Sequence, residues 1–180
     1  MEDKLLIWRL RRGSRDALRR TYDKYHGDLL KIAVVLTGGM NPAEDVVQDV
    51  FTRFAQSCGH LKLSGNLRNY LITSTLNGVR NLRRYRSRHE TQSLPEADGL
   101  TSAERRPEQW AVMSEQLERL AAAMARLPDE QREVITLRIE ADMTLRSIAQ
   151  LQKTSIGTVQ GRYRYGIEKL RSLLNGEIQE

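Results

Sequence analysis

The chain has 180 residues and a formal net charge of +6, which suits one or two small domains and favours a polyanionic partner, either a nucleic acid or a membrane surface. Its one cysteine, Cys58, excludes an internal disulfide and a paired-cysteine metal site. No apolar run approaches the length that spans a bilayer, so we expect no membrane insertion.

Two helices are predicted at the N-terminus. The first covers the apolar residues between Leu5 and Leu10, and a turn at Gly13-Ser14 separates it from the second. Ser14 can cap the second helix, which continues until Gly38-Gly39 end it. Acidic residues precede the first apolar patch and no small-residue cleavage site follows it, so this segment does not have the pattern of a signal peptide. We therefore expect a cytoplasmic protein.

A third helix is predicted to start at Asn41-Pro42-Ala43-Glu44, with a capping residue, a proline at the first helical position and an acid three residues after the cap. Its apolar residues recur at helical spacing and predict a buried stripe, which comprises Ala43, Val46, Val47, Val50, Phe51 and Phe54.

The opposite face of this helix is acidic and carries Glu44, Asp45, Gln48 and Asp49. Such a face can attract a basic partner, or it can simply complement the positive end of the helix dipole. The dipole explains Glu44 and Asp45 well. It explains Gln48 and Asp49 less well, because they lie beyond the first turn.

A fourth helix is predicted from Leu67 to Arg88, after a loop that ends at Ser64-Gly65-Asn66. It is rich in Thr and Asn, which weaken the helical preference, and it ends in a cluster of arginines. Amides, cations and Tyr70 together suit binding to separated nucleic-acid strands. The alternative is a solvated helix whose basic end complements its dipole.

The segment between Thr91 and Arg106 lacks apolar periodicity and predicts a flexible linker. We therefore expect one helical domain over residues 1–90, a linker over 91–106 and a second helical domain over 107–180. Residues 1–90 carry 17 basic and 9 acidic side chains, whereas residues 128–180 carry 8 of each. The positive surplus thus lies in the first domain.

The stretch from Leu127 to Leu174 has the pattern of a helix-turn-helix, in which the last helix enters the DNA major groove. Pro128 can begin one helix, Thr144 can cap a second and Ser155 can cap a third. Val134, Ile135 and Ile139 are the apolar residues of the first. The apolar stripe of the third comprises Val159, Tyr163, Ile167, Leu170 and Leu174.

The other face of this third helix offers side chains that can bond base edges or phosphates. They are Thr158, Gln160, Gly161, Arg162, Arg164 and Tyr165. The alternative is an ordinary three-helix packing unit with a solvated basic face.

Nothing in the chain predicts an active site. His26, His60 and His89 are scattered without ligand spacing, and no phosphate-binding glycine loop, nucleophile elbow or paired-carboxylate signature occurs. We therefore expect no catalytic residue, no metal and no cofactor.

Two motifs resemble those of the extracytoplasmic-function (ECF) sigma factors of bacterial RNA polymerase. One is AEDVVQDVF, from Ala43 to Phe51. The other combines Leu127-Pro128, the QREV run ending at Val134, Ile148-Ala149 and the SIGTVQGR run ending at Arg162. The resemblance extends from about Asp16 to Leu174 and implies two helical domains, one like sigma region 2 and one like sigma region 4.

The resemblance also implies partners and sites. Asp45, Gln48 and Asp49 would face the clamp helices, a coiled coil in the largest polymerase subunit. The downstream (−10) promoter element would be held by Ser64, Gly65, Asn66, Tyr70, Asn77, Arg80, Arg83 and Arg84. The upstream (−35) element would be read by Thr158, Gln160, Gly161, Arg162, Arg164 and Tyr165.

The chain departs from the family pattern at a few positions. Tyr70 stands where tryptophan is usual, and Asn81 where aspartate is usual. The turn Gln152-Lys153-Thr154 replaces an apolar residue, a glycine and a second apolar residue. A lysine in a turn that favours glycine indicates a different turn or some strain.

These features predict a sigma factor that binds core RNA polymerase and directs initiation at particular promoters, and an anti-sigma factor is an implied partner. The alternative is a helix-turn-helix regulator that binds duplex DNA and never joins polymerase. An RNA-binding or scaffold protein is a more distant alternative, and an enzyme is not expected.

Overall fold

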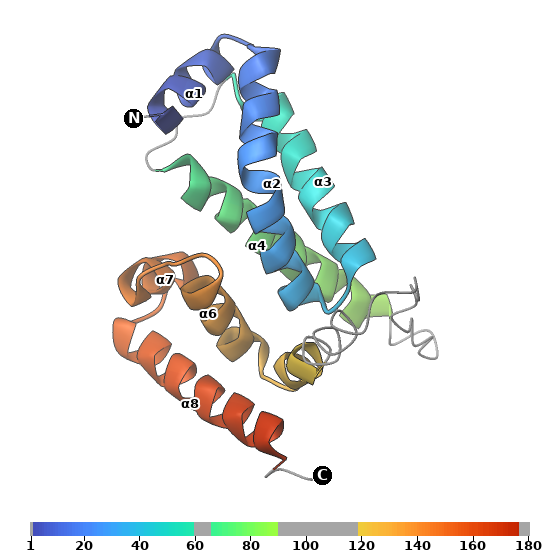
Figure 1. Ribbon diagram of the computed structural model, residues 1–180, viewed down its shortest axis with the longest axis vertical. Helices are drawn as coiled ribbons and strands as arrows, with labels where there is room; N and C mark the ends of the chain where they lie inside the picture. Colours follow the sequence, from blue (N-terminus) through green and yellow to red (C-terminus); the bar gives the residue numbers. More distant parts are fainter. Residues whose placement is uncertain (1, 60–65, 90–118, 177–180) are drawn as a thin grey trace, which may run out of the picture. The chain divides into compact units, whose positions relative to one another are not determined.

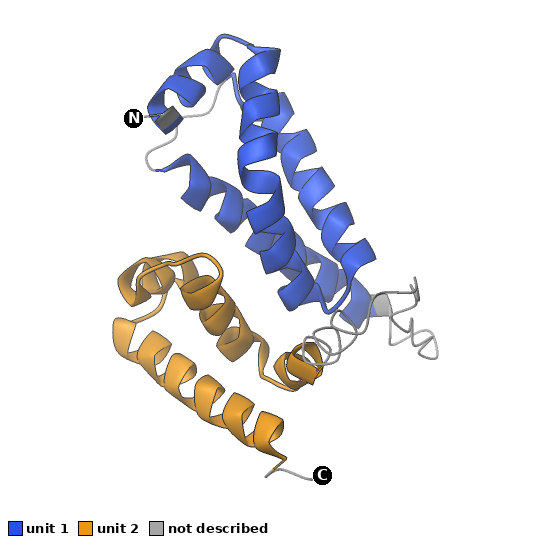
Figure 2. Ribbon diagram, in the orientation of Figure 1, with its two compact units in different colours: residues 1–94 blue, residues 95–180 orange. Residues whose placement is uncertain are grey.

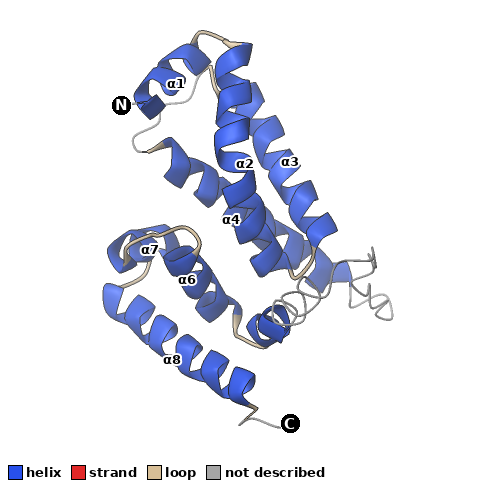
Figure 3. Cartoon of the chain, viewed as in Figure 1, coloured by secondary structure: helices blue, strands red, loops and turns tan. Residues whose placement is uncertain are grey.

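The computed structural model describes residues 2–59, 66–89 and 119–176, in which every element is a helix or a connecting loop and no strand occurs (Figures 1 and 3). The chain divides into two compact units, residues 1–94 and 95–180 (Figure 2). The predicted all-helical fold with two small domains is confirmed. The predicted linker, residues 91–106, and the start of the second predicted domain lie outside the described residues.

The N-terminal unit consists, within its described residues, of α1 (Glu2–Arg11), α2 (Arg15–Thr37), α3 (Met40–Ser57) and α4 (Leu67–His89). Helices α2, α3 and α4 pack against one another, and α1 packs on α2 (Figure 1). The largest fully buried side chains of this unit are apolar and comprise Leu29, Ile32, Leu36, Val47, Phe54, Leu67, Leu71, Ile72, Leu76 and Val79.

The boundaries of α2 are those predicted. The Ser14 Oγ accepts a hydrogen bond from the Ala17 N–H at 3.3 Å. Gly38 ends the helix in the left-handed conformation at φ +79°, which glycine adopts without steric cost.

The predicted cap of α3 is wrong. The helix begins at Met40 after an extended Gly39, so Asn41 lies inside the first turn and makes no capping hydrogen bond. The cap position is therefore Gly39, two residues earlier than the predicted Asn41. Pro42 still lies among the first residues of the helix, whose N–H groups have no partner within the helix, so its missing donor costs nothing.

Helix α4 is less uniformly a polar surface than the sequence indicated. Thr75 is fully buried, and its hydroxyl donates to the Leu71 carbonyl at 3.0 Å. Thr73 and Ser74 likewise donate to carbonyls four residues earlier, at 2.6 and 2.9 Å. A hydroxyl that is hydrogen-bonded within its own helix can lie in a core, so residue type alone did not reveal that Thr75 is buried.

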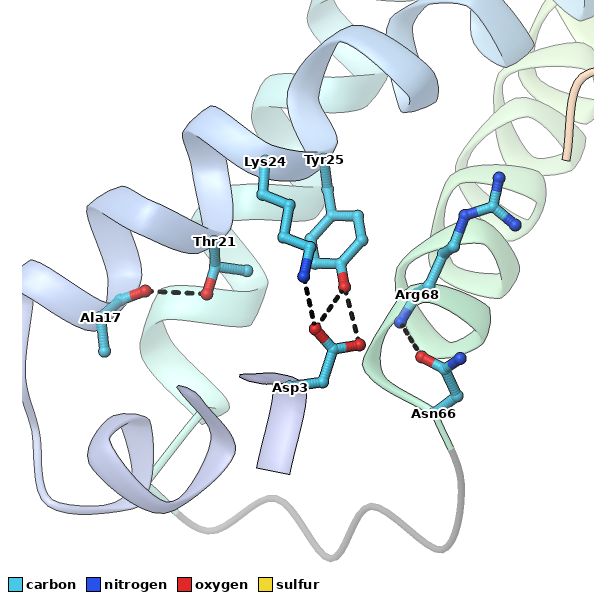
Figure 4. Close-up of polar contacts among 7 residues, drawn as sticks. All are labelled: Asp3, Ala17, Thr21, Lys24, Tyr25, Asn66 and Arg68. Atoms are coloured by element: carbon cyan, nitrogen blue, oxygen red, sulfur yellow. Dashed lines mark hydrogen bonds and ion pairs between the residues drawn. The ribbon is translucent and has the colours of Figure 1, made fainter. Parts of the chain in front are cut away.

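Helix α1 is held on α2 by a charged cluster (Figure 4). The Asp3 carboxylate accepts hydrogen bonds from Lys24 Nζ at 2.9 Å and from the Tyr25 hydroxyl at 2.8 Å. Partial burial opposes ionisation of Asp3, but these donors outweigh it and hold the pKa of Asp3 below its usual value. Burial and the bond to Asp3 raise the pKa of Tyr25 to about 12.

We therefore expect α1 to detach at low pH. A lowered pKa in the folded state stabilises the fold above the ordinary value of 3.8, and that contribution is lost as the pH falls through the lowered pKa. The protection of the α1 amides against hydrogen exchange, relative to an unfolded chain at the same pH, should fall over this range in the native chain. In an Asp3→Asn variant this protection should already be low at neutral pH. If the variant keeps the native protection at neutral pH, the assignment is wrong.

The C-terminal unit contains, within its described residues, a helical stretch over 119–125 followed by α6 (Asp129–Ile139), α7 (Leu145–Gln152) and α8 (Ile156–Asn175). Its core comprises Leu127, Val134, Ile135, Leu137, Ile148, Ala149, Val159 and Leu170 among others. Thr144 and Ser155 cap α7 and α8 as predicted, each accepting a hydrogen bond from an N–H three residues later. The prediction that Ile139 belongs to the apolar side of α6 is wrong. Ile139 is 57 % exposed at the end of the helix, and Leu137 is buried in the core instead.

Arg132 ties α6 to the helical stretch before it. Its guanidinium donates to the carbonyls of Met124 at 2.8 Å, Ala125 at 2.7 Å and Leu127 at 3.0 Å. The carbonyls at the end of a helix lack partners within it, and a half-buried arginine satisfies several of them at once.

Among the described helices none is both long and apolar enough to cross a membrane. The same residues contain no group of three or more His, Cys, Asp or Glu side chains that could hold a metal ion.

Candidate functional site

The acidic face of α3 points away from the core. Asp45, Gln48 and Asp49 are exposed, whereas Val46 and Val47 between them are 7 % and 1 % exposed. Asp49 pairs with Arg53 one turn later at 2.8 Å, with both side chains largely in solvent. An exposed pair of this kind contributes little to stability, so Asp49 can exchange Arg53 for another cation at small cost.

A hollow of about 620 Å³ adjoins this face between α2 and α3. Tyr22, His26 and Phe51 line it together with Gln48. The Tyr22 ring stacks on His26 with centroids 4.6 Å apart and meets Phe51 at 4.8 Å. Sequence analysis missed this aromatic cluster, although the spacing of Tyr22 and His26 by one helical turn is a signal that could have placed them together.

The start of α4 is fixed by Asn66. Its side-chain oxygen accepts a hydrogen bond from the Arg68 N–H at 2.9 Å (Figure 4). Tyr70 is half-buried, with its ring 6.1 Å from that of Phe54. Ser64 and Gly65, the other two residues of the predicted base pocket, lie outside the described residues.

The basic residues of α4 differ in what they contact. Arg83 is half-buried and donates to the Leu36 carbonyl at 2.5 Å, at the C-terminal end of α2. Arg84 is exposed and bonds to Asn81. Asn77 is exposed and Arg80 is half-buried. The α4 surface thus presents Asn77 and Arg84 to solvent, while Arg83 also braces the unit.

The exposed face of α8 carries Thr158, Gln160, Arg164 and Tyr165, and Gly161 and Arg162 are half-buried. Arg164 donates to the Tyr165 hydroxyl at 2.9 Å, and its guanidinium carbon lies 4.7 Å from the Tyr165 ring centre. These contacts group the two side chains on one patch. Of the six residues predicted to read the upstream element, four are therefore exposed and two are half-buried.

Arg162 belongs to a hydrogen-bonded chain that links all three helices of the helix-turn-helix. Its Nη1 donates to Gln152 Oε1 at 2.8 Å, and Gln152 Nε2 donates to Glu133 Oε1 at 3.0 Å. Glu133 is only 6 % exposed. The spacing of Glu133, Gln152 and Arg162 along the sequence gave no signal that they are hydrogen-bonded to one another.

The turn between α7 and α8 has the backbone that glycine favours. Lys153 lies in the left-handed conformation at φ +52° and ψ +46°, and its N–H reaches the Ala149 and Gln150 carbonyls. Of the two predicted alternatives, a different turn or some strain, this geometry agrees with strain, because a lysine adopts the backbone that glycine favours.

Lys153→Gly should therefore stabilise the C-terminal unit by between about 0.5 and 1 kcal/mol, because glycine removes the clash of Cβ but loses more chain entropy on folding. Thermal unfolding measures the change. Lys169→Gly, in the exposed interior of α8, is the control and should have the opposite sign. A lower midpoint for Lys153→Gly would contradict the strain.

Comparison with known proteins covers most of the chain. The family model described as Sigma-70 region 2 matches residues 21–89, and the one described as Sigma-70, region 4 matches residues 123–172. The ECF RNA polymerase sigma factor RpoE of Cereibacter sphaeroides is 31 % identical over 150 residues, which are 82 % of this chain and 78 % of that protein. The ECF RNA polymerase sigma factor SigW of Bacillus subtilis is 24 % identical over 176 residues, 93 % of this chain and 94 % of that one.

Solved structures share the fold. CnrH in complex with the cytosolic domain of CnrY matches with a TM-score of 0.72 and 22 % identity, over 98 % of this chain and 99 % of that one. The sigma factor RpoE from Bartonella quintana, in complex with the anti-sigma factor NepR, matches with a TM-score of 0.71 and 22 % identity, over 87 % and 96 % of the two chains.

Proposed function

The chain belongs to the ECF sigma factors of RNA polymerase, and we propose that it docks on core polymerase through α3 and reads promoter DNA with α4 and α8. It directs RNA polymerase to particular promoters and acts as a binding subunit in the cytoplasm, while the polymerase performs the chemistry. A regulator independent of polymerase is not supported, because the chain matches sigma region 2 as well as region 4.

The observation that carries this proposal is an exposed acidic helix face and a separate helix-turn-helix on one chain. Asp45, Gln48 and Asp49 would contact the clamp helices of the largest polymerase subunit, with the aromatic hollow beside them adding apolar area. Opposite charge across such an interface favours association and fixes its register.

The downstream element would lie along α4. Exposed Asn77 and Arg84 suit contacts to bases and phosphates, and Arg80 and Arg83 add positive charge beside them. Tyr70 is half-buried beside Phe54, so part of its ring is open to stack with a base. Ser64, Gly65 and Asn66 complete the proposed pocket for an extruded base.

The upstream element would be read by α8. Gln160 and Arg164 are exposed and suit base edges, while Thr158 and Tyr165 can reach phosphates. Gly161 allows close approach of the helix to the groove, and Arg162 lies at its edge.

An anti-sigma factor is a further proposed partner. CnrH and the Bartonella RpoE are each bound to a partner protein in their solved structures, and in the second case this partner is an anti-sigma factor. We propose that this chain also binds an anti-sigma factor, which would hold it inactive.

The test of the function is transcription in vitro with purified core polymerase and a library of random promoters. We expect the chain to co-elute with the core enzyme and to start RNA at a shared sequence. A chain that neither binds the core enzyme nor starts transcription on any template would refute the proposal.

Within this assay, Gln160→Ala and Arg164→Ala should change which upstream sequences are selected, since each base contact is typically worth about 1–3 kcal/mol. Arg171→Ala, exposed further along the same helix, should leave the selected sequences unchanged. Identical selections by all three variants and the native chain would contradict base reading by this face of α8.

A further inference from the structure

The hydrogen-bonded chain Glu133–Gln152–Arg162 has one possible polarity. A carboxylate only accepts and a guanidinium only donates, so the Gln152 amide must turn its NH₂ to Glu133 and its oxygen to Arg162. Both bonds are charge-assisted, which makes them shorter and stronger than bonds between neutral groups. Gln152 is therefore held at both ends, and its side chain has little rotational freedom.

This amide fixes the guanidinium of Arg162. One Nη1 hydrogen is committed to Gln152 at 2.8 Å, and this bond restricts the orientations open to the planar guanidinium and its other N–H groups. Arg162 lies three residues after the fully buried Val159, so it sits at the border of α8 rather than on the side opposite the core. On a helix in the major groove, that border faces the sugar–phosphate wall.

We propose that Gln152 is a positioning residue for upstream-element binding, which acts by presenting the free edge of Arg162 to a DNA phosphate. The inference rests on the proposed function. Its physical reason is preorganisation, because an arginine already held in its bound orientation loses less side-chain entropy when it contacts DNA. The buried Glu133 supplies the fixed charge at the other end, and Gln152 transmits its position across the turn.

The test measures promoter binding by the holoenzyme at several salt concentrations. The slope of log affinity against log salt is negative, and loss of one phosphate contact reduces its magnitude by about 0.9. We expect Arg162→Ala and Gln152→Leu each to reduce this magnitude by about that amount and the double variant to reduce it no further. Gln150→Leu, the same change on an exposed position of α7, should leave the slope unaltered.

A second variant separates positioning from packing. In the exchange Glu133→Gln/Gln152→Glu, the carboxylate at position 152 accepts from Arg162 and from the new amide at 133. It should restore the native slope. Additive losses in the double variant, a native slope for Gln152→Leu, or an exchange that folds and binds core polymerase without regaining the slope would each overturn the proposal. Failure of the native holoenzyme to bind any promoter would instead refute the function on which it rests.

Discussion

Replacing Asp45 and Asp49 by arginine should abolish co-elution with core RNA polymerase. Both side chains are exposed on α3, so the change leaves the core of the unit intact. Like charges brought together at an interface cost several kcal/mol, and about 3 kcal/mol corresponds to a loss of affinity of roughly a hundredfold. Gel filtration of the mixture and transcription from a selected promoter measure the effect.

The matched control is Asp16→Arg/Asp23→Arg. It makes the same change in net charge on the same unit. Asp16 pairs with Arg20 at 3.0 Å and Asp23 with Arg19 at 3.9 Å, each one turn away, as Asp49 does with Arg53. The control should bind polymerase as the native chain does. Equal losses in both variants would mean that overall charge, not the α3 face, governs binding. No loss in either would show that α3 is not the docking surface.

The acidic face could be predicted because it is a property of one helix. Apolar residues alternate with acids at helical spacing in α3, and this pattern identifies the buried side, which carries Ala43, Val46, Val47 and Val50. The pattern does not depend on which helices α3 packs against. The aromatic hollow could not be predicted in this way, since it depends on how α2 lies beside α3. Only the packing brings Tyr22 within 4.8 Å of Phe51.

The contacts of the basic residues likewise depend on packing between helices and not on the pattern of one helix. The sequence pattern and the family resemblance placed Arg83 and Arg162 among DNA-contacting side chains, because arginine can bond to bases and phosphates. In the structure, Arg83 reaches a carbonyl 47 residues earlier, and Arg162 bonds to a glutamine that is itself tied to a buried glutamate. Long side chains can reach across elements, and no local period in the sequence encodes such a partner.

Helix caps that depend on a single side chain could be predicted from the sequence. Ser14, Thr144 and Ser155 each cap a helix where expected, because a cap needs only a side-chain oxygen and an N–H three residues later. The cap at Asn41 failed although its pattern was the fullest. The preceding pair of glycines allowed the helix to start at Met40, and backbone freedom outweighed the side-chain signal.

Gly166→Val should strongly destabilise the C-terminal unit and leave the stability of the N-terminal unit unchanged. Gly166 is buried where α8 crosses α6, and a Cβ placed there would lie 2.8 Å from Ile135 Cδ1 and 3.2 Å from Gln131 Cβ. Ile135 is 2 % exposed and has little room to move. Overpacking of this kind costs about 3 kcal/mol, and valine also brings two further methyl groups.

Such a loss should lower the unfolding midpoint of a unit of this size by about 12 °C or more. Circular dichroism measures it, and hydrogen exchange assigns it to α6 and α8. Gly161→Val is the control, since a Cβ there meets Tyr165 Cε2 at 3.9 Å, an ordinary contact, and valine is the better helix former.

The Gly166→Val chain should still co-elute with core polymerase through α3 and lose selection of the upstream element. If both substitutions shift the midpoint equally, the close crossing of α6 and α8 does not set the stability of the unit. If Gly166→Val also abolishes polymerase binding, the assignment of docking to α3 alone is wrong, because the side chains that α3 presents to solvent are untouched by the change.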